Sequence, residues 1–444
     1  MPSTRLRANL RFSLGVLAVA AGAAGFAIAF HALLKAVTTH FYGAHDVLSA
    51  FRAMPAWQRL LLPAATGAAA GALAMVAARF GRGVGVGDVM EAVVIGQGRI
   101  SLRATTLKAL GAWLAISGGG SVGREGPIIQ FGGGLGGALG GWLLLGRERR
   151  RILVAAGTAA GFAAAYNTPF AALLFVIEVV TGFSALSAIL PALVATVAAT
   201  ALTRHFLGSG PIYGQRAFTQ ASDVELIAYV ALGLVAGLLA PLFLRLLSMG
   251  ERLFARIELP LFVEAGLGGL LVGALALRLP EVTGNGYESI NQILGDGLAL
   301  PTLLLLLVAK AVATTASVSS GAPGGVFTPT LLMGACVGGA LGHGAAAVLP
   351  LSAPPAAYAL VGMAAFCGAT THAPLMAAVL VFELSGDYAI VLPLLLATGL
   401  ATLVSERLRA DSIYEAELRR RGYAWDVTLG GRLITQEPAA EQEE

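Results

Sequence analysis

Two stretches of the chain decide the fold: Lys108–Gln130 reads KALGAWLAISGGGSVGREGPIIQ, and Lys310–Leu332 reads KAVATTASVSSGAPGGVFTPTLL. Laid over each other without a gap, at an offset of 202 residues, they share Lys, Ala, Ser, two Gly and Pro. A second pair, PFAALLFVIE and PLMAAVLVFE, starts at Pro169 and at Pro374 and ends in Glu178 and Glu383, an offset of 205. The chain is therefore expected to contain two copies of one unit.

Composition places both copies in a membrane. The chain is 57% hydrophobic and 12% charged, with a mean hydropathy of +0.78, whereas a soluble domain carries about 25% charged residues. Between Ile152 and Thr203 the one Asp, Glu, Lys, Arg or His is Glu178. Since a helix crosses the bilayer in about 20 residues, this run is long enough for more than one crossing. We expect an all-α polytopic membrane protein.

The expected organisation is an N-terminal transmembrane repeat (1–207), a polar linker (208–223), a C-terminal transmembrane repeat (224–422) and a polar cytoplasmic tail (423–444). Residues 281–296 are polar and are expected to form a loop within the second repeat. Gly- and Ala-rich runs at 131–142 and 334–344 are typical of close helix packing in membranes.

Basic residues set the expected orientation. Three arginines precede the first apolar run, which is too long for a signal-peptide core, and further arginines follow the last one. Because cytoplasmic loops are enriched in Lys and Arg, both termini are predicted to be cytoplasmic. The net charge is only +4, and topology accounts for the basic clusters, so no nucleic-acid partner is expected.

Gly and Pro break the helices of both repeats at matching places. Short apolar helices that end inside a membrane protein commonly point their termini at a transported ion. In the first repeat, Glu125 stands at such a break between glycines, with Pro127 suited to a first helical turn. The amides of residues 124–126 would form an anion site, and a carboxylate there would act as a tethered anion released by protonation. Glu125 is thus the candidate gate; a helix-capping glutamate is the structural alternative.

In the second repeat, Phe327 replaces the glutamate, so the backbone amides of Val326 and Phe327 would have to hold an anion. A third Gly-rich break, GVGVG at 83–87, is a further candidate for an ion-facing helix start. Lys108 and Lys310 either raise the anion potential of a pore or pair with carboxylates. Glu178 and Glu383 end matched helices, which indicates a structural role such as capping.

Other function classes fit less well. Residues 119–123 match G-x-S-x-G, but neither the strand nor the His base of a hydrolase is apparent, so no enzyme is expected. A cation transporter would need membrane carboxylates, whereas these breaks offer amides. The two cysteines and six histidines form no metal-ligand pattern, so we expect neither metal nor cofactor, with a small anion as substrate.

Four motifs in order resemble the CLC family of chloride channels and proton/chloride antiporters. They are GREGP at 123–127, Asn167-Thr168-Pro169 leading to Glu178, GAPGGVFTP at 321–329, and Tyr414 within DSIYEAEL. The resemblance extends from about Leu14 to Gly422. It implies two inverted repeats with broken and re-entrant helices, a homodimer with one pore per subunit, and, for a prokaryotic type without CBS domains, location in the bacterial inner membrane.

The resemblance also implies site roles. Glu125 matches the gating glutamate; the central anion site matches Val326, Phe327 and the Tyr414 hydroxyl; the outer site matches Arg124 to Gly126. At the 83–87 stretch, which includes Gly85, Val84 replaces the family's anion-coordinating serine and Gly87 replaces a proline. Loss of that hydroxyl predicts weaker chloride binding or an altered preference among anions. Fluoride therefore remains an alternative substrate.

Coupling to protons is the second departure from the family pattern. In proton-coupled members the residue after the Glu178 position is a second glutamate that feeds protons from the cytoplasm, and here it is Val179. A valine cannot relay a proton. The favoured prediction is a channel-like or weakly coupled chloride pathway, and the alternative is a proton-coupled chloride (or fluoride) antiporter.

Overall fold

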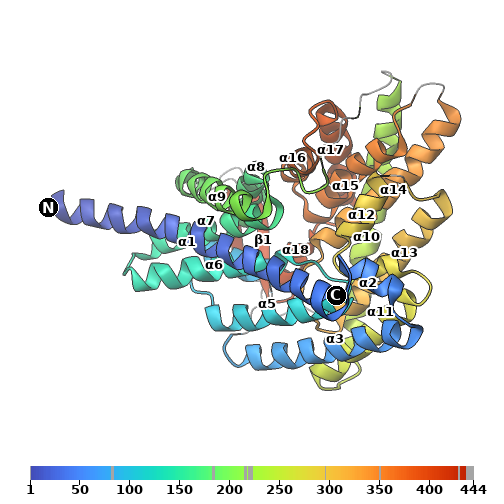
Figure 1. Cartoon of the computed structure of the whole chain (residues 1–444). Helices are drawn as coiled ribbons and strands as arrows, with labels where there is room; N and C mark the ends of the chain where they lie inside the picture. The colour runs from blue at the N-terminus through green and yellow to red at the C-terminus, as the bar shows by residue number, and fades with distance from the viewer. Residues whose placement is uncertain are drawn as a thin grey trace.

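The computed structural model describes residues 2–81, 85–182, 186–214, 218, 224–295, 297–349, 352–428 and 431–436. Apart from one hairpin, the regular elements of these described residues are helices, which confirms the all-α class. Figure 1 shows most helices of the first half on one side of the molecule and those of the second half on the other, with the long helix α1 extending outward.

The first half contains the following elements: α1 (Pro2–Ala36), η1 (Val37–Phe41), α2 (Val47–Ala53), α3 (Ala56–Ala78), α4 (Val86–Val94), α5 (Leu102–Ser117), α6 (Glu125–Trp142), α7 (Arg147–Tyr166), α8 (Pro169–Phe175), η2 (Val176–Thr181) and α9 (Leu186–Leu207). The helices α4 and α8 are far shorter than the bilayer is thick. They are the broken segments that the Gly and Pro pattern predicts.

The second half contains α10 (Glu225–Ala255), α11 (Leu261–Ala276), η3 (Pro280–Val282), α12 (Tyr287–Leu294), α13 (Leu300–Ser319), α14 (Phe327–Val348), α15 (Pro355–Thr371), α16 (Pro374–Ser385), α17 (Val391–Leu408), α18 (Ile413–Arg419) and the strands β1 (Tyr423–Thr428) and β2 (Gly431–Gln436). Among the described residues, seven helices are long and apolar enough to cross a membrane. The chain is an integral, multi-pass membrane protein.

One region differs from the sequence-based expectation, and the structure adds detail to a second. Residues 281–296 were predicted to form a loop, but helix α12 occupies half of this stretch, because Ile290, Ile293 and Leu294 give it a buried apolar face that the polar composition hides. The tail 423–444 was predicted only as polar; its described part forms the antiparallel hairpin β1–β2.

Glycine lets matched helices of the two repeats cross at backbone contact. A Cβ at Gly132 of α6 would overlap the carbonyl oxygen of Gly157 on α7, and the converse also holds. The second repeat uses the same device, with Gly334 of α14 against Gly362 of α15. The predicted packing function of the two Gly-rich runs is therefore confirmed.

The halves also pack against each other. Helix α3 lies along α11, where a Cβ at Gly269 would overlap the carbonyl oxygen of Pro63. Such close approach is typical of membrane helices, which associate through small residues rather than through a hydrophobic effect. This interface fixes the two repeats as one body around the central helix breaks.

Candidate functional site

The two sequence breaks meet at the centre of the molecule. The amide of Gly123 donates to the carbonyl of Gly325 at 2.6 Å, and the amide of Gly325 donates to the carbonyl of Gly123 at 2.8 Å. This antiparallel bridge joins the segments that lead into α6, which begins at Glu125, and into α14, which begins at Phe327. The starts of both helices therefore face the same central region.

Glu125 is fully buried at that point. Its Oε1 accepts a hydrogen bond from the hydroxyl of Thr328, and the Thr328 Oγ1 lies 3.1 Å from the hydroxyl oxygen of Tyr166 on α7. Its Oε2 has no hydrogen-bond partner among the described residues. A Cβ at position 123 would overlap this Oε2, so glycine is needed there to leave room for the carboxylate.

Arg124 directly precedes α6, and its side chain lies against Tyr287, the first residue of α12. Its guanidinium carbon lies 4.3 Å from the centre of the Tyr287 ring, a cation–π arrangement, and the residue is buried. The Tyr287 ring stacks in turn on Tyr213, with ring centres 5.5 Å apart. The Arg124 side chain is thus held by aromatic rings beside the glutamate.

A cavity of about 540 Å³ opens next to Glu125. It brings together five of the residues that the sequence singled out: Gly85, Gly126, Val326, Phe327 and Tyr414. Glu125 and Arg124 do not line it, although they directly precede Gly126 in the chain. Val84 lies outside the described residues.

The two repeat-related lysines have different environments. The Nζ of Lys310 is fully buried and donates to the carbonyls of Val282 and Gly284, both at 2.9 Å, so it ties α13 to the turn before α12. Lys108 lines the cavity, and its Nζ has no hydrogen-bond partner among the described residues. Lys310 is therefore bonded to backbone carbonyls, which is neither of the two roles left open by the sequence, and Lys108 is the lysine of the pair that lines the cavity.

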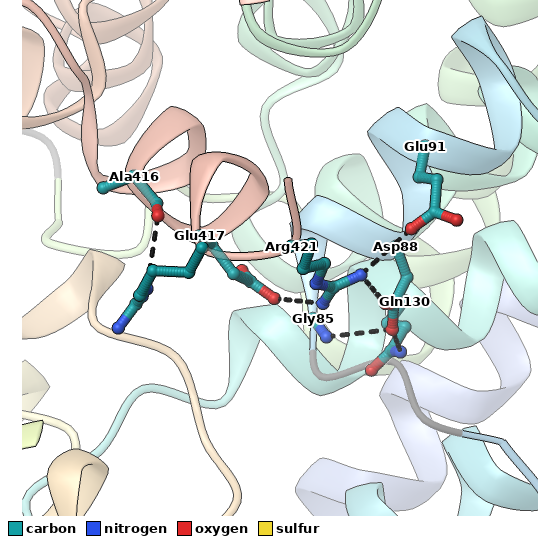
Figure 2. A network of polar contacts seen from close by, with 8 residues as sticks. Gly85, Asp88, Glu91, Gln130, Ala416, Glu417 and Arg421 are labelled. Atoms are coloured by element: carbon teal, nitrogen blue, oxygen red, sulfur yellow. Dashed lines mark hydrogen bonds and ion pairs between the residues drawn. The ribbon is translucent and has the colours of Figure 1, made fainter. Parts of the chain in front are cut away.

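Figure 2 shows a polar network that includes Gly85, Gln130, Glu417 and Arg421 of the cavity wall. Asp88 on α4 accepts hydrogen bonds from the Gly85 amide at 3.3 Å, from Gln130 on α6 at 2.6 Å and from Arg421 at 2.7 Å. Arg421 also pairs with Glu91 and Glu417. The Asp88 carboxylate therefore joins the start of α4, helix α6 and the segment that follows α18. Helix α18 carries Tyr414.

The matched glutamates exchange helix caps between the repeats. Glu178 accepts from the amides of Leu375 at 3.3 Å and Met376 at 2.6 Å, in the first turn of α16. Glu383 accepts from the amides of Phe170 at 3.2 Å and Ala171 at 2.8 Å, in the first turn of α8. The predicted structural role of these two glutamates is confirmed. Val179, next to Glu178, is buried in the π-helical turn η2.

Sequence reasoning missed four residues of this region: Tyr166, Thr328, Asp88 and Arg421. Thr328 stands where the first repeat has Gly126, so a hydroxyl at the start of α14 was a readable signal. Tyr166 directly precedes the Asn-Thr-Pro motif. The pairing of Asp88 with Arg421 joins positions 333 residues apart and had no local signal.

Comparison with known proteins agrees with this geometry. The family described as voltage gated chloride channel matches residues 66–406. A putative chloride channel protein ClcB-like of Ralstonia nicotianae is 41% identical over 88% of this chain and 93% of its own length. A voltage-gated ClC-type chloride channel ClcB of Salmonella typhimurium is 36% identical over 83% of this chain and 89% of its own length.

Solved structures show the same fold. A slow cyanobacterial Cl⁻/H⁺ antiporter superposes with a TM-score of 0.82 at 26% identity, covering 93% of this chain and 98% of that one. A eukaryotic CLC transporter superposes with a TM-score of 0.76 at 22% identity, covering 94% of this chain and 75% of that one. With its broken helices meeting at Gly123 and Gly325, the chain belongs to the voltage-gated chloride channel (CLC) family.

Proposed function

We propose that this protein conducts chloride across the membrane through a pore gated by Glu125. The single observation that carries the proposal is the convergence of the starts of α4, α6 and α14 and of Tyr414 on one cavity, with the buried carboxylate of Glu125 next in the chain to Gly126 of the lining. Helix starts present unpaired amides and the positive end of the helix dipole, which together bind anions.

The anion path follows from the cavity lining. The amides of Val326 and Phe327 at the start of α14, with the Tyr414 hydroxyl, form the central site. Gly85, beside Val84, lies toward the start of α4, and the amides of Arg124 to Gly126 lie at the start of α6. Backbone amides bind an anion weakly enough for it to leave, as conduction requires. The cavity wall carries Lys108, Arg420 and Arg421 against Glu251 and Glu417, and this excess of one formal positive charge (three against two) favours entry of anions over cations.

Glu125 acts as the gate because it places a carboxylate at the start of α6, one residue before Gly126 on the cavity wall. In the charged form it competes with chloride for the helix-start amides. Protonation removes that competition, so chloride flux should rise as the pH falls. Glu125 therefore blocks or opens the pore according to its protonation state, and it does not act as a nucleophile.

Channel-like conduction is the favoured mode. Val179 supports this mode. A valine cannot accept and release protons, and it stands at the position where proton-coupled members of the family have a glutamate. The curated relatives are named as channels. Proton-coupled exchange of chloride (or fluoride) is the second candidate, favoured by the superposition on a slow Cl⁻/H⁺ antiporter.

The same proposal includes the assembly and its setting. A homodimer with one pore per subunit, both termini in the cytoplasm and location in the bacterial inner membrane are what family membership and the arginine distribution support. The substrates are chloride or other small anions, with the lipid bilayer as the solvent of the outer helix faces, and no cofactor is required.

Simultaneous recording of chloride efflux and proton movement from liposomes tests the mode. Under an outward chloride gradient, a channel gives chloride efflux without coupled protons. Proton movement against its own gradient would establish the antiporter instead. Absence of chloride flux together with flux of fluoride or nitrate would overturn the assignment of chloride as the substrate. The changed anion preference would then be attributed to Val84.

A further inference from the structure

The hydroxyl groups around Glu125 form a chain with a defined direction. A threonine hydroxyl has one proton to donate. Because the Thr328 hydroxyl donates to Glu125 Oε1, its oxygen can only accept from Tyr166, 3.1 Å away. The proton order is therefore Tyr166 to Thr328 to the carboxylate, and all three residues are buried.

This arrangement is suited to a charged carboxylate. Hydrogen bonds to ionised groups are about twice as strong as neutral ones, and each bond in a chain polarises the next. The three side chains come from α6, α7 and α14, so the chain also fixes the glutamate between the two repeats.

Resting on the proposed gating role of Glu125, we propose that Thr328 and Tyr166 are positioning residues that hold the ionised gate in its blocking position and set the pH at which it opens. When Glu125 becomes protonated, the carboxylic acid no longer needs a donor, and the holding interaction weakens. Thr328 and Tyr166 thereby favour a closed pore at neutral pH without contacting the transported ion.

Several titratable groups lie near the gate, and one of them, Tyr166, is bonded to Thr328. The charged and titratable side chains that interact with Glu125 are Arg124, Tyr166, Tyr213, Tyr287 and Tyr414. A change in pH response after removal of the Thr328 hydroxyl therefore reports the hydroxyl together with its contact to Tyr166, and Tyr166→Phe measures the second part alone.

The test is the pH midpoint of chloride efflux from liposomes containing the full-length protein. Thr328→Val keeps the shape of the side chain but removes the donor, so the gate is protonated more readily. The midpoint should move to higher pH by about one to two pH units. Thr328→Ser retains the donor and should restore a midpoint close to that of the unaltered protein.

The matched control is Thr330→Val. Thr330 is also buried on α14, but its hydroxyl donates to the carbonyl of Phe327 at 2.6 Å. This variant should keep the original midpoint. Tyr166→Phe removes the second donor and should shift the midpoint upward by a few tenths of a pH unit; it carries the test if Thr328→Val does not fold.

Two outcomes separate this inference from the proposed function. If Glu125→Gln abolishes the pH response but Thr328→Val and Tyr166→Phe keep the original midpoint, the hydroxyl chain does not hold the gate and the inference is wrong. If Glu125→Gln leaves the pH response intact, the gate assignment itself fails. In the Glu125→Gln background, Thr328→Val should add no further pH effect.

Discussion

Gly123 and Gly325 exchange two backbone hydrogen bonds, so equivalent positions of the two repeats pair directly and in antiparallel directions. A reciprocal contact of this kind requires a local two-fold relation between the repeats. The glutamate caps obey the same relation, since Glu178 and Glu383 each cap the helix start of the other repeat. The symmetry places both helix breaks at one point, and the site follows from it.

The reciprocal caps predict paired effects on stability. Glu178→Ala and Glu383→Ala should each destabilise the protein by about 0.5–2 kcal/mol, because each leaves two helix-start amides without an acceptor. Thermal unfolding in detergent measures both. Glu264→Ala, at the start of α11 with no described cap bond, is the control and should change little. A large effect for one cap glutamate and none for the other would contradict the equivalence.

Much of this arrangement was readable from the sequence. The repeat offset, the helix breaks at Glu125 and Phe327, and the capping role of Glu178 and Glu383 follow from local patterns of Gly, Pro and Glu. The Asp88–Arg421 ion pair could not be predicted from the sequence, because it joins two residues far apart in the chain that only folding brings together. Helix α12 was missed because its polar composition obscured a buried apolar face.

The Asp88 network predicts a long-range effect on anion binding. Arg421→Gln should weaken chloride binding by roughly twofold to thirtyfold, since a change in a network of this kind commonly modulates coupling by about 0.5–2 kcal/mol. The reason is that Asp88 bonds the Gly85 amide and Arg421 follows the helix of Tyr414. Calorimetric titration with chloride measures the change.

Arg420→Gln is the matched control for charge. Arg420 also lines the cavity, but it pairs with Glu251 on α10 rather than with Asp88. Both variants lose one positive charge at the cavity wall. Equal weakening by the two would show that charge alone matters and that the Asp88 contact does not position the site.

Tyr414 should contribute its hydroxyl to the central anion site. Tyr414→Phe removes that donor and keeps the ring that packs edge-on against Phe175. A hydrogen bond to a charged group contributes about 1.5–3 kcal/mol, so chloride affinity should fall by about tenfold or more. Tyr358→Phe, remote from the cavity, should leave the isotherm unchanged. An unaltered isotherm for Tyr414→Phe would remove this residue from the site.

Val84→Ser should restore the hydroxyl that the family pattern has at this position. Because a hydrogen bond to a charged group contributes about 1.5–3 kcal/mol, chloride binding should tighten by about tenfold or more. Calorimetric titration with chloride measures the change. Ala78→Ser, at the end of α3 on the cavity wall, controls for the addition of a hydroxyl elsewhere in the cavity. No tightening for Val84→Ser would mean that the 83–87 stretch does not contact the anion.

Chloride efflux from liposomes containing Glu125→Gln, compared with the unaltered protein from about pH 4 to about pH 8, tests the central claim most directly. Glutamine is neutral at every pH, so it should mimic the protonated gate. The account predicts efflux that is high and independent of pH in the variant, against efflux that rises on acidification in the unaltered protein. A variant that keeps the original pH dependence would contradict the assignment of Glu125 as the gate.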